Sequence, residues 1–448
     1  MDSAKGMRNL KIVLVILLIF LLGVSIGLGR FQRVSALSNS TYEDLKVFSD
    51  VLGLVQKEYV EETNSKDLVY GAIKGMLETL DPHSAFMPPN MYKEMREETQ
   101  GRFEGLGIEI TMKDGVLTVV SPIEDTPAFK AGIQAGDQIV KIEGELTKDL
   151  TLMDSVKRLR GPKGSKVTIT IMREGLTKPR EFTLIRDVIP IRSVRHELLE
   201  KNYGYIRVSQ FQEKTSSEFE KEMKALEEEN KAPLKGLILD LRNNPGGLLE
   251  QAAQIADQFI ESGLIVSVEG RREDQNRKYY AHPEGNISHY PLIVLVNGGS
   301  ASGAEIVAGA IQDHGRGILL GTHTFGKGSV QTIFPLKDGS GLRLTTARYY
   351  TPNGRSIQAK GIVPDIIVEP SQPEEEKVAP APKFPSEKDL ERHLIDIDKG
   401  IEKVPPKEKE KEKPKKEEGK GKRPADNQLE RALQLLKSWD IFRKAAME

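Results

Sequence analysis

The sequence contains no cysteine among its 448 residues. This absence excludes disulfide bonds, thiolate metal sites and cysteine nucleophiles, and it leaves the redox compartment unreadable from this residue type. An excess of charge is also lacking, because 65 basic and 66 acidic residues leave a formal net charge of -1. The chain therefore gives no electrostatic reason to expect a nucleic acid as a partner.

Metal and nucleotide sites also lack their usual residues. His83, His314 and His323 have no acidic partner at metal-ligand spacing, so we expect no metal and no other cofactor. Glycine-rich stretches occur outside the context of a phosphate loop, so no nucleotide is expected. With 38% apolar residues, the chain is nevertheless large enough for two or three domains with cores of their own.

One long hydrophobic run stands near the N-terminus. Lys5, Arg8 and Lys11 precede an apolar stretch from Ile12 to Gly29, which is about long enough to cross a bilayer with its basic flank in the cytoplasm. Residues 1–36 are therefore predicted to be a membrane anchor or a signal peptide, and the remainder to be exported to the periplasm or cell envelope. The small residues VSA at 34–36 leave cleavage open, although the length favours an uncleaved anchor over a signal peptide or a buried helix.

Three patterns divide the exported part. Residues 37–95 carry apolar residues at helical spacing and are predicted to form an N-terminal helical region. Residues 96–177 have the pattern of short strands and turns with helices at 127–132 and 151–160, which indicates a small β-rich module. Residues 178–370 alternate strands with helices, and apolar runs such as LILDL predict strands buried on both faces of an α/β sheet.

The end of the chain changes in composition. Residues 371–425 are rich in Pro, Lys and Glu and are expected to be a charged low-complexity linker, since such a segment cannot bury enough apolar area to fold alone. Residues 426–448 are expected to form a helix with Asp426 as its N-cap. Its apolar face comprises Leu429, Leu433, Leu436 and Trp439. This helix and those at the N-terminus could join subunits of a homo-oligomer, and packing within one chain explains both patterns equally.

The stretch VNGGSASGAE at 296–305 places two serines between a strand-like run and a helix. A nucleophilic serine needs an exposed oxygen, a base and donors for the oxyanion. Ser302 stands at the expected N-cap of a helix over 303–314, where the Gly303 N–H is free to face a reacting group, and Ser300 lies further back in the turn. Ser302 is therefore the better candidate, and an ordinary tight turn is the alternative.

A candidate base follows in FGKGSVQT at 325–332. Lys327 stands between two glycines at the expected start of a strand, where Lys327, Ser329 and Gln331 would share one face and Gln331 could orient the lysine amine. To act as a base, Lys327 must be buried enough to lower its pKa by roughly two to three units. The alternatives are a surface lysine without function, or a histidine base at 314 or 323.

The β-rich module contains FEGLG at 103–107, followed by GIEI. Successive N–H groups in this loop could converge on a carboxylate, and the next strand offers an edge to which a peptide can add. Together with PAFKAGIQAGDQIVKIEG at 127–144, this resembles a PDZ domain in the circularly permuted arrangement of bacterial proteases. The residues expected to bind free, apolar C-termini are Phe103, Gly105, Leu106 and Gly107. Turn glycines without a binding role are the alternative.

Five stretches in order resemble the carboxy-terminal processing proteases, which are serine endopeptidases of exported compartments. The stretches are LDPHSAFM at 80–87, the PDZ-like module, LDLRNNPGG at 239–247, VNGGSASGAEI and FGKGSVQ. The resemblance implies an α/β core of the crotonase/ClpP-like type with an inserted PDZ domain and N-terminal helices. It also implies that Ser302 is the nucleophile, that Lys327 is the general base and that Gln331 supports this base. The oxyanion donors that it implies are the N–H groups of Gly303 and Gly246. The family usually has alanine or serine where this chain has Gly303.

The same resemblance implies an endopeptidase that recognises polypeptides through apolar C-termini. Arg160, at the end of the module's longer helix, could link peptide binding to the protease core, or it could only pack on the module's surface. A Ser/His hydrolase on a related sheet and a non-catalytic PDZ scaffold are the rival functions. The presence of serine, lysine, glutamine and NPGG together disfavours the scaffold, since a binding module needs none of them.

Overall fold

The structure is a computed structural model that describes residues 39–113, 115–175, 177–283, 290–371, 385–394 and 426–445. The predicted anchor or signal peptide at 1–36 lies outside these residues. No helix in the described ranges is long and apolar enough to cross a membrane. The contacts within the chain divide it into two units at residue 73.

The first unit contains helices in the region where the sequence predicts them. Helix α2 spans Asn39–Glu58 and helix α3, Ser65–Glu78, begins in this unit. The Gln56 side chain donates a hydrogen bond of 2.6 Å to the Ser65 hydroxyl between the two helices. Apolar residues of α2 such as Leu45 and Val51 remain half exposed, so the described residues of this unit build no core around them.

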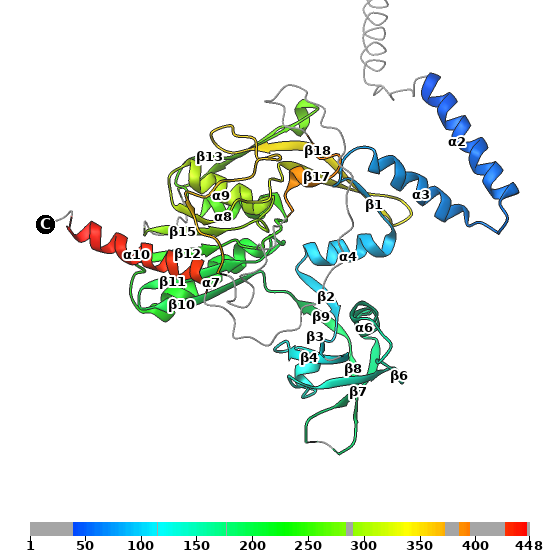
Figure 1. Cartoon of the computed structure of the whole chain (residues 1–448), viewed down its shortest axis with the longest axis horizontal. Helices are drawn as coiled ribbons and strands as arrows, with labels where there is room; N and C mark the ends of the chain where they lie inside the picture. The colour runs from blue at the N-terminus through cyan, green and yellow to red at the C-terminus, as the bar shows by residue number, and fades with distance from the viewer. Residues whose placement is uncertain are drawn as a thin grey trace, which may run out of the picture. The chain divides into compact units, whose positions relative to one another are not determined.

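The β-rich module, which contains β3, β4, β7 and β8 of Figure 1, is an antiparallel sheet in the strand order β3-β4-β5-β7-β8. The strands are β3 (Ile108–Lys113), β4 (Val116–Pro122), β5 (Gln138–Ile142) with β6 (Glu145–Leu146) beside it, β7 (Lys166–Met172) and β8 (Arg180–Ile185). The helices are α5 (Pro127–Lys130) and α6 (Leu152–Leu159). Helix α6 begins where Thr151 and Asp154 form a reciprocal capping box. The two-stranded ribbon of β2 (Arg102–Gly105) and β9 (Asp187–Pro190) leads into and out of the module, which is therefore an insertion.

The α/β core is built on a six-stranded sheet whose last five strands run parallel. In order the strands are β10 (Val194–Glu200), β11 (Tyr203–Val208), β12 (Gly236–Asp240), β15 (Leu292–Val296), β16 (Ile318–Gly321) and β19 (Ile366–Ile367). The helices of one face are α7 (Thr215–Asn230), α8 (Leu249–Asp257) and α9 (Gly303–Asp313). Helix α10 (Asn427–Ala445) covers the other face (Figure 1). Because both faces are covered, the strand LIVLV is buried at every position.

A second sheet brings the motif at 80–87 to the lysine segment. Its strands are β1 (Ala85–Met87), β13 (Gly263–Gly270), β14 (Arg277–Ala281), β17 (Ser329–Pro335) and β18 (Gly341–Tyr350), with α4 (Pro89–Thr99) following β1 and the short η1 (Glu273–Gln275) between β13 and β14. Strand β18 pairs with β1 and also with β17. Residues before β1 therefore lie beside the start of β17, although more than 200 positions separate them in the sequence.

The tail of the chain needs two corrections. Residues 385–394 fall inside the predicted linker, yet they form a short 3-10 helix, η3 (Glu387–Asp389), in which Glu387 is fully buried. In α10, Asp426 is an N-cap as predicted, since it accepts a hydrogen bond from the Leu429 N–H at 3.0 Å. Trp439, however, is 54% exposed, so the apolar face of α10 ends at Leu436. This helix packs on its own chain's sheet, which favours packing within one chain.

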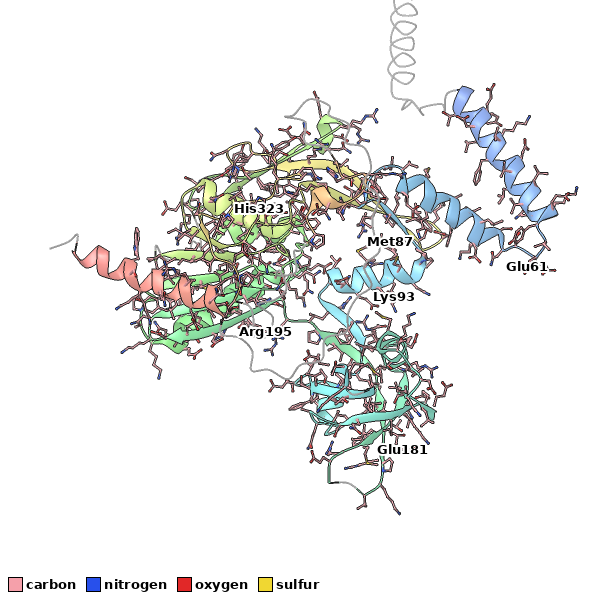
Figure 2. The ribbon with its side chains drawn as sticks, in the orientation of Figure 1. Glu61, Met87, Lys93, Glu181, Arg195 and His323 are labelled. Carbon is pink, nitrogen blue, oxygen red and sulfur yellow. The ribbon has the colours of Figure 1, made fainter. Side chains whose placement is uncertain are left out.

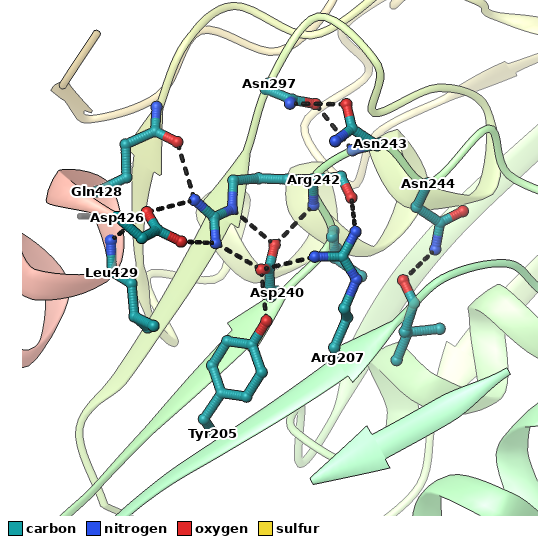
Figure 3. A network of polar contacts seen from close by, with 12 residues as sticks. Tyr205, Arg207, Asp240, Arg242, Asn243, Asn244, Asn297, Asp426, Gln428 and Leu429 are labelled. Atoms are coloured by element: carbon teal, nitrogen blue, oxygen red, sulfur yellow. Dashed lines mark hydrogen bonds and ion pairs between the residues drawn. The ribbon is translucent and has the colours of Figure 1, made fainter. Parts of the chain in front are cut away.

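A network of ion pairs fastens the start of α10 to the end of β12 (Figure 3). The Arg242 guanidinium donates to both carboxylate oxygens of Asp426 at 2.8 Å and to those of Asp240 at 2.7 and 3.0 Å. Asp240 is fully buried and also accepts from the Tyr205 hydroxyl at 2.7 Å. Paired charges of this kind tolerate burial. The network holds Arg242 in place. This residue begins the segment 242–247, whose Gly246 lies against Ser302.

Candidate active site

Ser302 is the N-cap of α9, as the sequence predicts, and its backbone is strained. Its φ of 52° and ψ of -112° lie in a region that residues with a side chain rarely occupy. The turn is held by the Ala301 N–H, which donates to the Asn244 carbonyl at 2.9 Å. Ser300 is fully buried and donates to the Leu241 carbonyl at 2.8 Å, so it is structural. The geometry therefore agrees with the choice of Ser302 over Ser300.

The predicted catalytic residues come together at one cavity. Ser302, Gly303, Lys327 and Gln331 line a cavity of about 640 Å³ between α9 and β17. Gly246 lies directly against it, because a Cβ atom at this position would be 2.7 Å from the Ser302 Cβ and 2.9 Å from the Gly303 nitrogen. A residue with a side chain would not fit there.

The lysine loop, residues 325–328, differs slightly from its prediction. Lys327 does not open β17, which begins two residues later at Ser329. Burial lowers the pKa of Lys327 and the charge of Arg343 acts in the same direction, while the carboxylates of Glu387, Glu305 and Asp81 partly oppose this change. The direction is the one that a lysine base requires, because only the neutral amine can accept a proton.

Gln331 does not bond to Lys327 in this structure. Its amide nitrogen donates instead to the hydroxyls of Thr345 at 3.0 Å and Ser329 at 3.3 Å. Lys327, Ser329 and Gln331 nevertheless line the same cavity, although the pairing of β17 with β18 has a bulge between Val330 and Gln331. The Gln331 amide oxygen is left buried and without a hydrogen-bond partner among the described residues. It is thus a free acceptor at the cavity.

Asp81 orients that amide, a role that sequence reasoning missed. The Thr345 hydroxyl accepts from Gln331 and donates to Asp81 at 3.1 Å. Burial acts to raise the pKa of Asp81, but hydrogen bonds from Ser84, the His83 N–H and Thr345 lower it overall. An ionised Asp81 can only accept, so it dictates that Thr345 donates to it and receives from the Gln331 amide nitrogen. The motif LDPHSAFM was the available signal, but it gave no role for Asp81.

The candidate nucleophile and the candidate base are not in hydrogen-bond contact. None of the hydrogen bonds between described residues joins the Ser302 hydroxyl to the Lys327 amine. The Ser302 side chain acts to lower the pKa of the buried Tyr349 hydroxyl, which burial raises well above its usual value. The Tyr349 hydroxyl donates to the Lys327 carbonyl. Proton transfer therefore requires a side-chain rearrangement within the cavity.

Of the two predicted oxyanion donors, one N–H group is free among the described residues and the other already donates a hydrogen bond. The Gly303 N–H takes part in no hydrogen bond between described residues, as expected for the first residue of a helix. The Gly246 N–H donates to the Asn244 side chain at 2.8 Å and is therefore engaged. A Cβ at position 303 would lie 2.9 Å from the ring of Phe211, so glycine at this position accommodates that ring.

Glu305 joins the serine turn to the lysine loop. It is fully buried and accepts from the N–H groups of Ser302, Gly326 and Lys327 at 2.7 to 2.9 Å, and from the Thr324 hydroxyl at 2.5 Å. Burial raises the pKa of Glu305 to about 7, although these hydrogen bonds act to lower it. The sequence offered one signal, an acidic residue in an otherwise uncharged first helical turn, but no partner.

The histidines do not supply an alternative base at this cavity. His314 contacts the Leu264 carbonyl at 2.7 Å, and the exposed His323 (Figure 2) contacts the Thr324 carbonyl at 3.0 Å. Neither residue lines the cavity of Ser302. His83 has an acidic partner that sequence spacing did not reveal, since its Nε2 lies 2.8 Å from the carboxylate of Glu387, 304 positions away. The Ser/His reading is thus disfavoured.

The candidate peptide site of the β-rich module has the expected loop. Gly107 has a φ of 75°, and its carbonyl accepts from the Ile123 N–H, while the Leu106 carbonyl accepts from the Ala128 N–H. The N–H groups of Leu106 and Gly107 donate to no described residue, and β3 beside them is an edge strand. These two amides can therefore face a carboxylate.

Phe103 and Arg160 contact each other. Phe103 lies in β2, opposite Ile189 of β9, and so outside the loop itself. The guanidinium of the exposed Arg160 lies 5.0 Å from the centre of the Phe103 ring. This cation–π contact gives Arg160 a packing role. Its role in gating stays a prediction.

The chain is similar to known proteases in both sequence and structure. The model of peptidase family S41 matches residues 202–368, that of the PDZ domain residues 105–184, and that of the activating protease CtpB N-terminal domain residues 28–90. A carboxy-terminal-processing protease of Bartonella bacilliformis is 48% identical over 341 residues, which cover 75% of this chain and 78% of the relative. The carboxy-terminal processing protease CtpA of Bacillus subtilis is 36% identical over 373 residues, covering 81% and 78%. Among solved structures, a photosystem II D1 C-terminal processing protease is 30% identical and covers 72% of this chain and 92% of its own, with a TM-score of 0.42.

Proposed function

Because the chain belongs to the carboxy-terminal processing proteases of peptidase family S41, and is therefore a serine peptidase with a PDZ domain, we propose that Ser302 and Lys327 are its catalytic dyad. One observation supports this proposal above the others. A strained serine at a helix N-terminus and a lysine of lowered pKa line the same cavity, and one buried carboxylate, Glu305, holds the backbone of both. Perturbed groups in a cleft are typical of catalytic sites.

In the proposed reaction the neutral Lys327 amine takes the proton of the Ser302 hydroxyl while Oγ attacks the scissile carbonyl carbon. The resulting ammonium gives this proton to the leaving amine, and the acyl group stays on Ser302. Water then attacks the acyl-enzyme, with Lys327 again as base, and releases the new C-terminus. Before the first step, the Ser302 hydroxyl and the Lys327 amine must come into hydrogen-bond contact.

The remaining site residues have supporting roles in this proposal. The free amide oxygen of Gln331 accepts a hydrogen bond from the Lys327 amine and directs it toward Ser302. The Gly303 N–H stabilises the oxyanion of the tetrahedral intermediate. The Gly246 N–H joins it once the oxyanion replaces the Asn244 side chain.

Substrates are proposed to be polypeptides of the exported compartment with apolar C-termini. The C-terminal carboxylate would accept from the N–H groups of Leu106 and Gly107, and the peptide backbone would add to the open edge of β3. Ile108, Ile110 and Met112 alternate along β3 and are partly buried against the module's core, so they offer an apolar floor.

The test uses the full chain and an unfolded polypeptide with apolar C-terminal residues, offered with a free or an amidated C-terminus. The wild type should cleave the free form faster, and Ser302→Ala and Lys327→Ala should abolish cleavage. Full activity of Lys327→Ala would point to another base. Unchanged turnover in Ser302→Ala would refute the nucleophile, and equal rates on both forms of the substrate would refute carboxylate recognition.

The location and assembly belong to the same proposal. We expect the chain on the extracytoplasmic side, anchored or released according to the fate of residues 1–36, and able to form homo-oligomers. Cell fractionation, N-terminal sequencing and light scattering of the purified protein test these points. A full-length chain in the cytoplasmic fraction would contradict the location.

A further inference from the structure

The segment 385–394 returns to the protease core beyond the match to family S41, which ends at residue 368. Its Glu387 has no exposed surface. The carboxylate lies 2.8 Å from the His83 ring nitrogen and accepts from the Gln358 side chain at 2.9 Å. Burial acts to raise the pKa of Glu387, but these partners and Lys327 lower it overall, so the group is ionised.

This segment holds the lysine loop on both sides of Lys327. The Glu387 N–H donates to the Phe325 carbonyl at 3.0 Å, two residues before the lysine. Gln358, which is held by the Glu387 carboxylate, accepts from the Gly328 N–H at 3.0 Å, one residue after it. The packing here is tight, because a Cβ at Gly328 would be 2.5 Å from the Gln358 nitrogen.

Charged groups from four parts of the fold face Lys327. Arg343 belongs to β18, Glu305 to α9, Asp81 to the turn before β1, and Glu387 to the returning segment. His83 contacts Glu387 directly, and its carbonyl accepts from Arg343 at 2.9 Å. Glu305 and Asp81 are occupied with backbone and hydroxyl donors. Glu387 differs from these two because it is supplied by a segment outside the matched protease region.

We propose that Glu387 is a positioning residue of the active site, through which segment 385–394 fixes the lysine loop and stabilises the protonated form of Lys327 in the resting enzyme. The proposal rests on the role of Lys327 as general base. The protease domain is then incomplete without the segment that follows residue 384. A carboxylate near a buried lysine favours its charged form, so Glu387 sets how alkaline the solution must be before the base is neutral.

The experiment measures the pH profile of single-turnover cleavage from pH 5.5 to 9.5 by the full chain and its Glu387→Gln variant. The rising limb should move toward acid by about one pH unit in Glu387→Gln, because the lysine loses a nearby negative charge. The matched control is Glu391→Gln, which removes the same charge from an exposed position of the same segment. Its profile should coincide with that of the wild type.

The outcomes separate this inference from the proposed dyad. If Lys327→Ala cleaves as fast as the wild type, the dyad itself is wrong. If Lys327→Ala is inactive and the limb of a folded Glu387→Gln stays within 0.2 units or moves toward alkali, the role of Glu387 is refuted while the dyad stands. If Glu387→Gln does not fold, Glu387→Asp is measured instead. Its side chain keeps the negative charge but is one methylene shorter, so the carboxylate lies farther from its partners. A smaller acid shift with a lower plateau rate supports the proposal, and an unchanged profile overturns it.

Discussion

Replacement of Glu305 by glutamine is the perturbation that we expect to damage the active site most selectively. The carboxylate accepts four hydrogen bonds, two on each oxygen, and three of the donors are backbone N–H groups of the serine turn and the lysine loop. Glutamine has nearly the same shape but only one acceptor oxygen. Its NH₂ group would face two donors, so two of the four hydrogen bonds are lost.

The size of the effect follows from those two hydrogen bonds. Hydrogen bonds to a charged group contribute about 1.5 to 3 kcal/mol each, so the loss is about 3 kcal/mol or more. If relaxation of the fold recovers none of it, and the loss falls on the alignment of Ser302 with Lys327, kcat drops by about 100-fold. KM should change little, because the proposed recognition of the C-terminus uses the PDZ module.

The assay is steady-state cleavage of the unfolded polypeptide at 25 °C, together with the rate at which a fluorophosphonate labels Ser302. Glu228→Gln, a change of the same kind at an exposed position of α7, is the control and should behave as the wild type. Circular dichroism and thermal melting show whether the Glu305→Gln chain is folded at the assay temperature. A folded variant with kcat and labelling rate within threefold of the wild type would refute the reasoning.

Three further predictions concern stability and binding. The folded pKa of Glu305, about 7, lies above its ordinary value of 4.5, so its contribution to stability is present below pH 4.5 and is lost as the pH rises through 7. The free energy of unfolding of the wild type, measured by chemical unfolding, should therefore fall by an amount on the order of 3 kcal/mol over this pH range, and that of Glu305→Gln should not. Parallel plots of the free energy of unfolding against pH for the two proteins would contradict this prediction. Gly107→Ala should abolish peptide binding in calorimetry, since its Cβ would lie 2.3 Å from the Thr126 side chain. Gly115→Ala is the control and should keep peptide binding, because Gly115 has a similar φ and open space around it. Equal affinities of the two variants would show that the loop at Gly107 does not bind the peptide. Leu436→Ala should lower the free energy of unfolding by about 2 to 4 kcal/mol and Trp439→Ala by less than about 0.5, and similar losses would show that α10 is not packed as described.

Local patterns in the sequence predicted the individual elements closely. The strands and helices of the PDZ module and of the protease core begin and end within a few residues of the expected positions, because apolar periodicity, glycines and caps act over short distances. The same reasoning placed Ser302 at a helix N-cap. It also gave Lys327, Ser329 and Gln331 one face, and all three line the cavity. The hydrogen bond of Gln331 to Thr345 could not be predicted, because it depends on how two strands pair and leaves no mark in one strand alone.

The resemblance of motifs identified the serine, the lysine and the glycines of the cavity, whereas their supports were found only in three dimensions. Asp81 reaches Gln331 through Thr345 because β1 and β17 pair with the same strand. Glu387 was assigned to a linker, because the composition around it carries no sign of the pocket that receives it.

The sequence by itself determined the order of the domains, the helical and extended segments, and the type of residue available for catalysis. Tertiary structure decided which of these residues are in contact and which charged groups lie near Lys327. It also decided that segment 385–394 of the tail packs against the protease core. The physical reason is the range of the forces involved: backbone preferences and amphipathic periodicity act between residues a few positions apart. The hydrogen bonds and burial that tune Ser302 and Lys327 arise only when distant strands and loops are packed together.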